Sequence, residues 1–225
     1  MTAKTLFITG ASSGIGEATA RAAVAQGWNV GLFARRADKL QALAAELGET
    51  ALPLPGDVSR AEDLTKALAT LADRFGAVDA AYANAGMGLD HPGVEKGEPE
   101  EWRRMIDVNV MGVLYTAHAA LPHLRSSKGH MLLTGSAAGR REIKGSVYGA
   151  SKWFVHGFAE NLAAEMHEWG GRCTVIAPGM VNTAFFDQPK PDKIQPDDVA
   201  RAALFALSAV RIRQAVSSVQ SSQRW

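Results

Sequence analysis

Short apolar segments alternate with longer amphipathic segments along almost the whole chain, and this alternation restricts the fold more than any other feature. Several short segments are apolar throughout, as strands buried on both faces are. Strands that alternate with helices predict a parallel sheet covered by helices on both faces. The seven expected strands are Thr5–Thr9, Asn29–Phe33, Ala51–Leu54, Ala80–Ala83, His130–Thr134, Arg172–Ile176 and Ala215–Val219. The expected helices are Gly14–Gln26, Asp38–Leu47, Ala61–Phe75, Glu100–Arg125, Val147–Trp169 and Pro196–Ser208.

The chain has the size and the even composition of one folded domain. Its 225 residues are 47% apolar and 21% charged, which is ordinary for a globular protein. No internal repeat or low-complexity linker divides it, so we expect residues 1–225 to form one domain. The polar segment Pro189–Pro196 carries the strongest signal for a long loop, and we expect it to be a mobile lid.

Residues that favour helix ends support several of these boundaries. Gly27 and Gly48 follow the first two helices, where a left-handed residue commonly ends a helix. Ser59 and Glu62 have the spacing of a capping box before the third helix. Pro196 suits the first turn of the last helix.

Charge and cysteine content exclude several classes of protein. The formal net charge of +1 gives no electrostatic reason to expect nucleic acid or an acidic membrane surface as a partner. Cys173 is the only cysteine and the six histidines lack metal-ligand spacing, so no disulfide and no metal site is expected. No apolar run reaches the roughly 18 residues of a membrane span. Without a signal segment near Met1, a cytoplasmic protein is expected.

The first expected strand runs directly into a glycine-rich turn, Gly10-Ala11-Ser12-Ser13-Gly14-Ile15-Gly16, and then into a helix. Glycines let the backbone approach a pyrophosphate closely, and the helix N-terminus offers free amides and partial positive charge. The spacing departs from the usual Gly-x-Gly-x-x-Gly fingerprint, so a plain tight turn is the alternative. The lysine of a nucleotide triphosphatase loop is missing, so the turn favours a dinucleotide over ATP or GTP.

The end of the second expected strand bears on which dinucleotide is bound. An acidic residue there would bind the ribose hydroxyls of NAD, but this chain has Ala34, followed by Arg35 and Arg36. A guanidinium can pair with the 2′-phosphate of NADP through charge-assisted hydrogen bonds. We therefore expect NADP rather than NAD, with Arg35 as the main contact. The alternative is that both arginines are solvated ends of a strand.

A series of motifs, in order along nearly the whole chain, resembles the short-chain dehydrogenase/reductase family. The motifs are Thr9-Gly10-x-x-x-Gly14-Ile15-Gly16, Asp57-Val58, Asn84-Ala85-Gly86, Asn109, Ser136, Tyr148-x-x-x-Lys152, and Pro178-Gly179 with Thr183. The resemblance implies a single-domain Rossmann fold with a doubly wound, mostly parallel seven-stranded sheet. It also implies hydride transfer between a nicotinamide dinucleotide and a carbonyl or alcohol. The stretches Glu101–Gly112 and Ser146–Phe158 are similar to the bacterial serine/3-hydroxy acid dehydrogenase-like group.

The resemblance also implies which residues form the site. The catalytic residues would be Asn109, Ser136, Tyr148 and Lys152. The cofactor would contact Gly10, Ser12, Ser13, Gly14, Ile15, Gly16, Arg35, Arg36, Asp57, Val58, Asn84, Ala85, Gly86, Tyr148, Lys152, Pro178, Gly179, Val181 and Thr183.

Tyr148 and Lys152 suit acid/base chemistry for a physical reason. An unperturbed tyrosine has a pKa of about 10, too high for a good acid/base near neutral pH. Lys152 is four residues later on one expected helix, so both side chains share a face. A cation about 4 Å away is worth roughly three pKa units at an effective dielectric near 20, and burial would oppose this shift. The pair therefore predicts a pKa of Tyr148 lowered toward neutral.

Two further polar residues have both a catalytic and an ordinary explanation. Ser136 follows the fifth expected strand and can hydrogen-bond a substrate oxygen beside Tyr148, although most such serines only form turns. Asn109 lies in an expected apolar helix. By resemblance it would hold a water that relays protons to Lys152, and otherwise it is an amide bonded to neighbouring backbone.

The expected substrate is a small carbonyl or alcohol, and its recognition is less defined by the sequence. Arg140 or Arg141 could meet an anionic substrate, although solvated arginines are the ordinary reading. An apolar wall is expected from Met87, Met180, Phe185 and Phe186, which flank the cofactor motifs.

The helix that carries Tyr148 is apolar on several sides, which favours a homodimer or homotetramer. A non-catalytic NADP(H)-binding sensor or scaffold on the same fold is the alternative to an enzyme.

Overall fold

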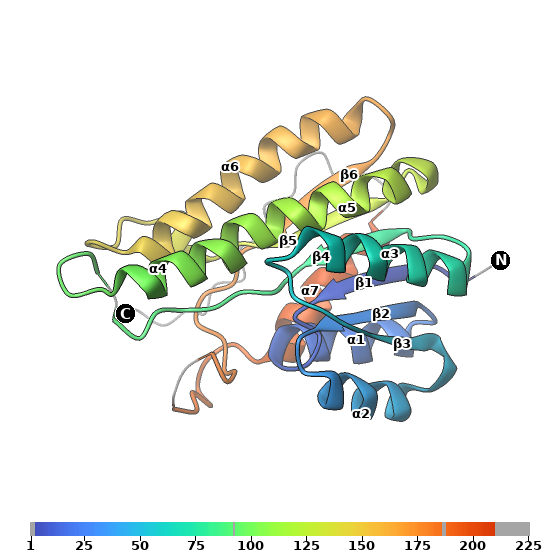
Figure 1. Cartoon of the computed structure of the whole chain (residues 1–225), viewed down its shortest axis with the longest axis horizontal. Coiled ribbons are helices and arrows are strands. Elements are labelled where there is room, and N and C mark those ends of the chain that lie inside the picture. The colour runs from blue at the N-terminus through green and yellow to red at the C-terminus, as the bar shows by residue number, and fades with distance from the viewer. Residues whose placement is uncertain (1–2, 92, 186–187, 210–225) are drawn as a thin grey trace.

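Six parallel strands form the sheet at the centre of the protein (Figure 1). The computed structural model describes residues 3–91, 93–185 and 188–209. The order across the sheet is β3-β2-β1-β4-β5-β6. The strands are β1 (Thr5–Thr9), β2 (Asn29–Ala34), β3 (Ala51–Pro55), β4 (Ala80–Ala83), β5 (His130–Thr134) and β6 (Arg172–Ile176). These bounds confirm the predicted single-domain Rossmann-type fold. The seventh predicted strand, Ala215–Val219, lies outside the described residues, so the described sheet has six strands rather than seven.

Helices cover both faces of the sheet (Figure 1). The central strand β1 is buried on two sides because alternate side chains enter different cores: Phe7 packs into one, and Leu6 and Ile8 into the other. On the Phe7 side lie α3 (Ala61–Phe75), α5 (Gly112–Ser127) and α6 (Val147–His167). On the Ile8 side lie α1 (Gly14–Ala25), α2 (Ala37–Leu47) and α7 (Pro196–Ser208).

The strand order reverses at β1, and this reversal locates a crevice. β1 pairs with β2 on one side and with β4 on the other. The connection after β1 leads to β2 and the connection after β4 leads to β5, so these two connections leave neighbouring carboxyl ends in opposite directions across the sheet. Ligands of open parallel sheets bind at such a switch point. The glycine turn after β1 and the Asn84 segment after β4 both lie there.

The predicted helix Glu100–Arg125 is not one regular helix. It consists of α4 (Pro99–Ile106), a π-helical turn η2 (Asp107–Met111) and α5. Single π turns of this kind occur frequently at functional sites. Asn109 lies in η2 and is completely buried.

Most predicted helix ends are confirmed, and one is wrong. Gly27 and Gly48 follow α1 and α2 with φ angles of 82° and 78°, although a ψ of −160° places Gly48 outside the left-handed helical region, and Pro196 is at the start of α7. The predicted capping box of Ser59 and Glu62 is absent, because α3 begins after Arg60 without a side-chain cap. Two short 3₁₀ turns complete the fold, η1 (Gly48–Thr50) and η3 (Ala137–Gly139).

Within the described ranges, no helix combines the length and the apolar character needed to cross a bilayer. The same residues contain no group of three or more His, Cys, Asp or Glu side chains placed to hold a metal ion.

Candidate active site

The glycine turn is packed so closely against its neighbours that side chains are excluded from it. A Cβ on Gly16 would lie 2.3 Å from the carbonyl oxygen of Gly10 and 2.8 Å from Nδ2 of Asn84. Gly10 has a φ of +69°, and a Cβ there would lie 2.9 Å from the Cα of Ala85. Ser13, which precedes α1, caps none of its first amides with its side chain. The turn therefore presents bare backbone and free amides, as a pyrophosphate requires.

Asn84 ties together the carboxyl ends of three strands. Its Nδ2 donates to the carbonyl oxygen of Thr9 at 3.0 Å, and its Oδ1 accepts from Oγ1 of Thr134 at 3.1 Å. The hydroxyl of Thr9 in turn accepts from the backbone amides of Asn84 and Ala85, at 3.0 and 3.1 Å. The Asn84-Ala85-Gly86 segment is thus fixed beside the glycine turn.

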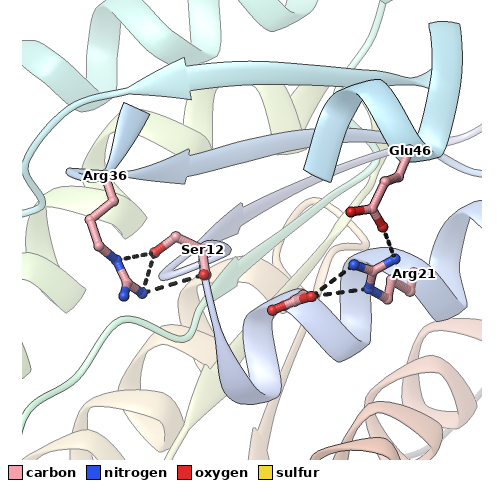
Figure 2. Close-up of polar contacts among 5 residues, drawn as sticks. Ser12, Arg21, Arg36 and Glu46 are labelled. Atoms are coloured by element: carbon pink, nitrogen blue, oxygen red, sulfur yellow. Dashed lines mark hydrogen bonds and ion pairs between the residues drawn. The ribbon is translucent and has the colours of Figure 1, made fainter. Parts of the chain in front are cut away.

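Arg36, rather than Arg35, reaches the glycine turn (Figure 2). Its Nη2 donates to the hydroxyl oxygens of Ser12 and Ser13 at 2.8 and 2.7 Å, and its Nε reaches Oγ of Ser12 at 3.2 Å. In the part of the chain that the structure describes, the exposed Arg35 side chain makes no hydrogen bond or ion pair. The contact predicted for Arg35 therefore suits Arg36 better, since its guanidinium already lies beside a phosphate-binding turn.

The Asp57-Val58 pair after β3 is fixed by local contacts. Oδ1 of Asp57 accepts from the backbone amide of Ser59 at 2.9 Å and from its hydroxyl at 2.8 Å. Val58 is buried, and a Cβ on Gly112 of α5 would lie 3.0 Å from it. These contacts attach the segment to the start of α5.

A cavity of about 930 Å³ opens at the carboxyl ends of the strands. Gly14 lies close by, because a Cβ there would be 3.0 Å from Cγ2 of Thr183. Many residues expected from the sequence share the wall of this cavity: Ile15, Asn84, Gly86, Ser136, Tyr148, Lys152, Pro178, Gly179, Val181 and Thr183.

Ser136, Tyr148 and Lys152 meet in the wall of the cavity. Tyr148 and Lys152 lie one turn apart on α6, and Ser136 precedes η3. The side chain of Ser136 lies close enough to Tyr148 to influence the ionisation of its phenol. Nζ of Lys152 lies 5.9 Å from the centre of the Tyr148 ring and donates to the carbonyl oxygen of Thr134 at 2.8 Å. The hydroxyl oxygen of Ser136 also accepts from the amide of Ala138 at 3.1 Å, which orients it.

Burial controls the protonation of this pair. Loss of hydration raises the pKa of Tyr148 from its ordinary value, and the hydrogen bond from Ser136 opposes this change only in part. Burial lowers the pKa of Lys152 to about 8. The lowered tyrosine pKa expected from charge alone is therefore wrong for this structure, because desolvation is the largest influence on the pKa of Tyr148 and raises it.

The side chain of Asn109 is occupied by backbone contacts. Its Oδ1 accepts from the amide of Met87 at 2.9 Å, and its Nδ2 donates to the carbonyl oxygen of Met87 at 2.9 Å. Nδ2 also reaches the hydroxyl of Ser151 at 3.3 Å, and that hydroxyl donates to the carbonyl oxygen of Tyr148 at 2.7 Å. Asn109 thereby joins the loop after β4 to the helix that carries Tyr148.

The rim of the cavity agrees in part with the sequence expectations. Met87, Met180 and Phe185 belong to its lining, and the Phe185 ring centre lies 5.7 Å from that of Tyr148. Phe186 lies outside the described residues. Arg141 also lines the cavity, where it could meet an anionic group.

The predicted lid segment Pro189–Pro196 is attached to Asn182 at several points. Oδ1 of Asn182 accepts from the amide of Lys190, and its backbone amide donates to Ile194, both at 2.8 Å. Its Nδ2 also donates to Oε1 of Gln195 at 3.0 Å. Mobility of the segment stays a prediction.

Comparison with known proteins decides the family. A family model described as short chain dehydrogenase matches residues 4–193. The chain belongs to the short-chain dehydrogenase family. A serine 3-dehydrogenase of Agrobacterium fabrum is 40% identical over 182 residues, which are 80% of this chain and 73% of that protein.

Solved structures of a dehydrogenase and a reductase have a similar fold. The closed form of a serine dehydrogenase complexed with NADP⁺ is 29% identical, has a TM-score of 0.90, and is matched over 98% of this chain and 96% of that one. A 3-ketoacyl-(acyl-carrier-protein) reductase from Brucella melitensis complexed with NADH is also 29% identical, with a TM-score of 0.89 and 97% of each chain covered. Both forms of the coenzyme therefore occur among structures similar to this short-chain dehydrogenase.

Sequence reasoning missed three residues that shape the site of this short-chain dehydrogenase. The carbonyl oxygen of Thr134 accepts a hydrogen bond from Nζ of Lys152, and the hydroxyl of Ser151 on α6 accepts one from Asn109. The third is His156, whose Nε2 lies 3.2 Å from the carbonyl oxygen of Ser136. His156 follows Lys152 by four residues, as Lys152 follows Tyr148, so helical spacing could have drawn attention to it.

Proposed function

We propose that this short-chain dehydrogenase interconverts a carbonyl and a secondary alcohol with NADP(H), using Tyr148 as the acid/base. The observation that supports this most is the shared cavity wall, in which Tyr148, Lys152 and Ser136 lie next to the glycine turn. A general acid must lie within hydrogen-bond reach of its substrate, and an open cavity of this size provides that access.

The residues of the glycine turn and of the cavity wall beside it fit a nicotinamide dinucleotide. The bare turn at Gly10 and Gly16 would accept the pyrophosphate, and Arg36 with Ser12 and Ser13 would face the adenosine ribose. Pro178, Gly179, Val181 and Thr183 would flank the nicotinamide end. When bound, this coenzyme supplies or accepts the hydride.

In carbonyl reduction, the phenol of Tyr148 donates a proton to the substrate oxygen as negative charge develops there. The hydroxyl of Ser136 donates a hydrogen bond to the same oxygen and orients it. The ammonium of Lys152 stabilises the phenolate that remains. Asn109 acts in this account by joining η2 to α6, through Ser151 and the Met87 backbone.

A coenzyme oxidation assay tests the proposal. Purified protein with NADPH and a panel of ketones, aldehydes and keto acids should oxidise the coenzyme, and hydroxy acids with NADP⁺ should reduce it. The similarity to a serine 3-dehydrogenase is the reason to test serine and other 3-hydroxy acids first. Coenzyme binding without turnover of any substrate would instead support a non-catalytic sensor or scaffold.

Replacing Arg36 with alanine should weaken NADP binding about tenfold or more and leave NAD binding nearly unchanged. The reason is that charge-assisted hydrogen bonds to a phosphate contribute about 1.5–3 kcal/mol, and NAD has no 2′-phosphate. Titration of each coenzyme by calorimetry measures this difference.

Arg21→Ala is the matched control for Arg36→Ala, because Arg21 is an exposed arginine paired with Glu17 and Glu46 away from the turn (Figure 2). A loss of NADP affinity in Arg35→Ala but not in Arg36→Ala would show that Arg35, rather than Arg36, contacts the 2′-phosphate. An equal loss for NAD and NADP in Arg36→Ala would contradict a role in choosing between the coenzymes.

Carbonyl reduction should slow as the pH rises past about 8, because burial lowers the pKa of Lys152 to about 8. Below that pH the ammonium is charged and can stabilise the phenolate, and above it the charge is lost. The pH profile of kcat/KM measures this, since it reports the free enzyme. In Lys152→Met the residual activity should lack this decline. A wild-type profile that declines only near the ordinary lysine pKa of about 10.4 would contradict the account.

The proposal includes a cytoplasmic homodimer or homotetramer. Trp153 is 51% exposed on α6, and the same helix carries the partly buried, stacked rings of Phe154 and Phe158. Such an apolar helix face is typical of a subunit contact. Light scattering after gel filtration, together with cell fractionation, would test assembly and location.

A further inference from the structure

Two side chains of helix α6 contact backbone carbonyl oxygens of the segment that carries Ser136. Tyr148, Lys152 and His156 are spaced four residues apart, so they follow one face of the helix. Nζ of Lys152 donates to the carbonyl oxygen of Thr134 at 2.8 Å, and Nε2 of His156 lies 3.2 Å from the carbonyl oxygen of Ser136. The chemistry proposed above uses Tyr148 and Lys152 and leaves His156 without a role.

The protonation of His156 follows from its two partners. The Nε of Arg140 lies 3.1 Å from Nδ1 of His156, and an arginine can only donate. Nδ1 must therefore be the bare acceptor, and the proton is on Nε2, from which it is donated to the carbonyl oxygen of Ser136. That oxygen also accepts from the backbone amide of Gly139 at 2.9 Å.

The imidazole ring is wedged between the glycines on either side of Ser136. A Cβ on Gly135 would lie 2.9 Å from Nε2 of His156, and one on Gly139 would lie 2.7 Å from its Cδ2. His156 is only 3% exposed. The ring thus fills the space that the two glycines leave, and it fits this segment both in shape and in hydrogen bonding.

We propose that His156, oriented by Arg140, is a positioning residue that fixes the backbone of Ser136 so that its hydroxyl stays aimed at the oxygen shared with Tyr148. This inference rests on the proposed function, because it assigns the oriented hydroxyl a part in carbonyl reduction. His156 itself is not among the residues that line the cavity, so it would act through Ser136, which does line it.

Burial and the neighbouring positive charges together lower the pKa of His156 and so favour its neutral form. Burial lowers its pKa most, and the nearby charges of Arg140 and Lys152 lower it further, while the Ser136 carbonyl and Glu160 raise it. Glu160 also pairs with Arg140, at 3.8 Å. A proton on Nδ1 would face the Arg140 donor directly, so acid should loosen the contact rather than strengthen it.

The test compares two substitutions at one position. His156→Leu removes both hydrogen bonds, whereas His156→Gln retains one donor and one acceptor. We expect His156→Leu to lower kcat about five- to tenfold, because the lost hydrogen bond to the Ser136 carbonyl is the one that acts on the hydroxyl, with little change in KM for NADPH. His156→Gln should recover most of kcat. Hydrogen–deuterium exchange should be faster over residues 135–140 in His156→Leu than in the wild type.

His130→Leu is the matched control. His130 is also a buried histidine with one side-chain hydrogen bond, to Thr174 at 2.8 Å, but it is at the opposite end of β5 from the site. This variant should lose stability and keep its kcat. An unchanged kcat in His156→Leu, or an equal loss of kcat in His130→Leu, would overturn the proposal. If the wild type reduces no carbonyl, only the proposed function fails. The role of His156 is then tested by hydrogen–deuterium exchange alone, and equal exchange over residues 135–140 in His156→Leu and the wild type would overturn it.

Discussion

Tyr148→Phe should lower kcat for carbonyl reduction by about a hundredfold to ten-thousandfold, the contribution of a positioned general acid. The change removes one oxygen and leaves the ring, so its packing against Phe185, 5.7 Å between ring centres, should persist. Coenzyme affinity and thermal stability should stay close to those of the wild type. Steady-state kinetics, coenzyme titration and a melting curve together measure these outcomes.

Tyr115→Phe is the control for this substitution, because Tyr115 is a partly buried tyrosine of α5 that packs against the core. It should keep the wild-type kcat. A Tyr148→Phe protein with unreduced kcat would remove Tyr148 from the chemistry, whatever the effect of the control.

Gly16→Ala should have the second largest effect, on coenzyme binding. The added Cβ would lie 2.3 Å from the carbonyl oxygen of Gly10, so the backbone of the turn has to move. Overpacking of this kind costs about 1–3 kcal/mol, which corresponds to a roughly five- to 150-fold loss of affinity if the whole cost falls on the binding conformation. Calorimetric titration of NADPH measures the affinity, and a melting curve shows how much of the cost falls on folding.

Gly157→Ala provides the matched glycine. Gly157 also lies within a helix, α6, and nothing lies within 4 Å of a Cβ built there. Alanine should stabilise that helix by up to about 1 kcal/mol without changing coenzyme affinity. Wild-type affinity in Gly16→Ala would contradict the assignment of the glycine turn as the site that binds the pyrophosphate.

The order of strands and helices could be predicted because its signals are local. Apolar runs, helical periodicity and glycines at helix ends each act within about one turn of the chain, so a single sequence contains them. The Gly10–Gly16 turn belongs to the same class, since its position between β1 and α1 is visible from neighbouring residues. The proximity of Tyr148 and Lys152 follows from helical spacing, because both lie on α6. The addition of Ser136 could be expected only from the resemblance to a family, because Ser136 precedes η3, a separate element.

The parts that could not be predicted depend on contacts between distant segments. The π turn at Asn109 accompanies hydrogen bonds to Met87, 22 residues earlier, and helical periodicity contains no trace of them. The choice of Arg36 over Arg35 depends on the direction in which the chain leaves β2, since only one guanidinium then reaches Ser12.

The pKa of Tyr148 could not be predicted from the sequence for a related reason. Its distance from Lys152 follows from helical spacing, but the depth of its burial depends on the packing of the whole domain. Burial is the largest influence on this pKa and raises it, so charge alone predicted the wrong direction.

Deuterium transfer tests the central claim most directly. NADPH labelled at the hydride-donating carbon of the nicotinamide is incubated with the protein and a substrate from the carbonyl panel, and the products are examined by mass spectrometry. We expect deuterium on the alcohol carbon with the wild type, and a rate reduced in parallel with kcat in Tyr148→Phe. A protein that binds NADPH tightly and transfers no deuterium to any carbonyl would contradict the enzyme assignment.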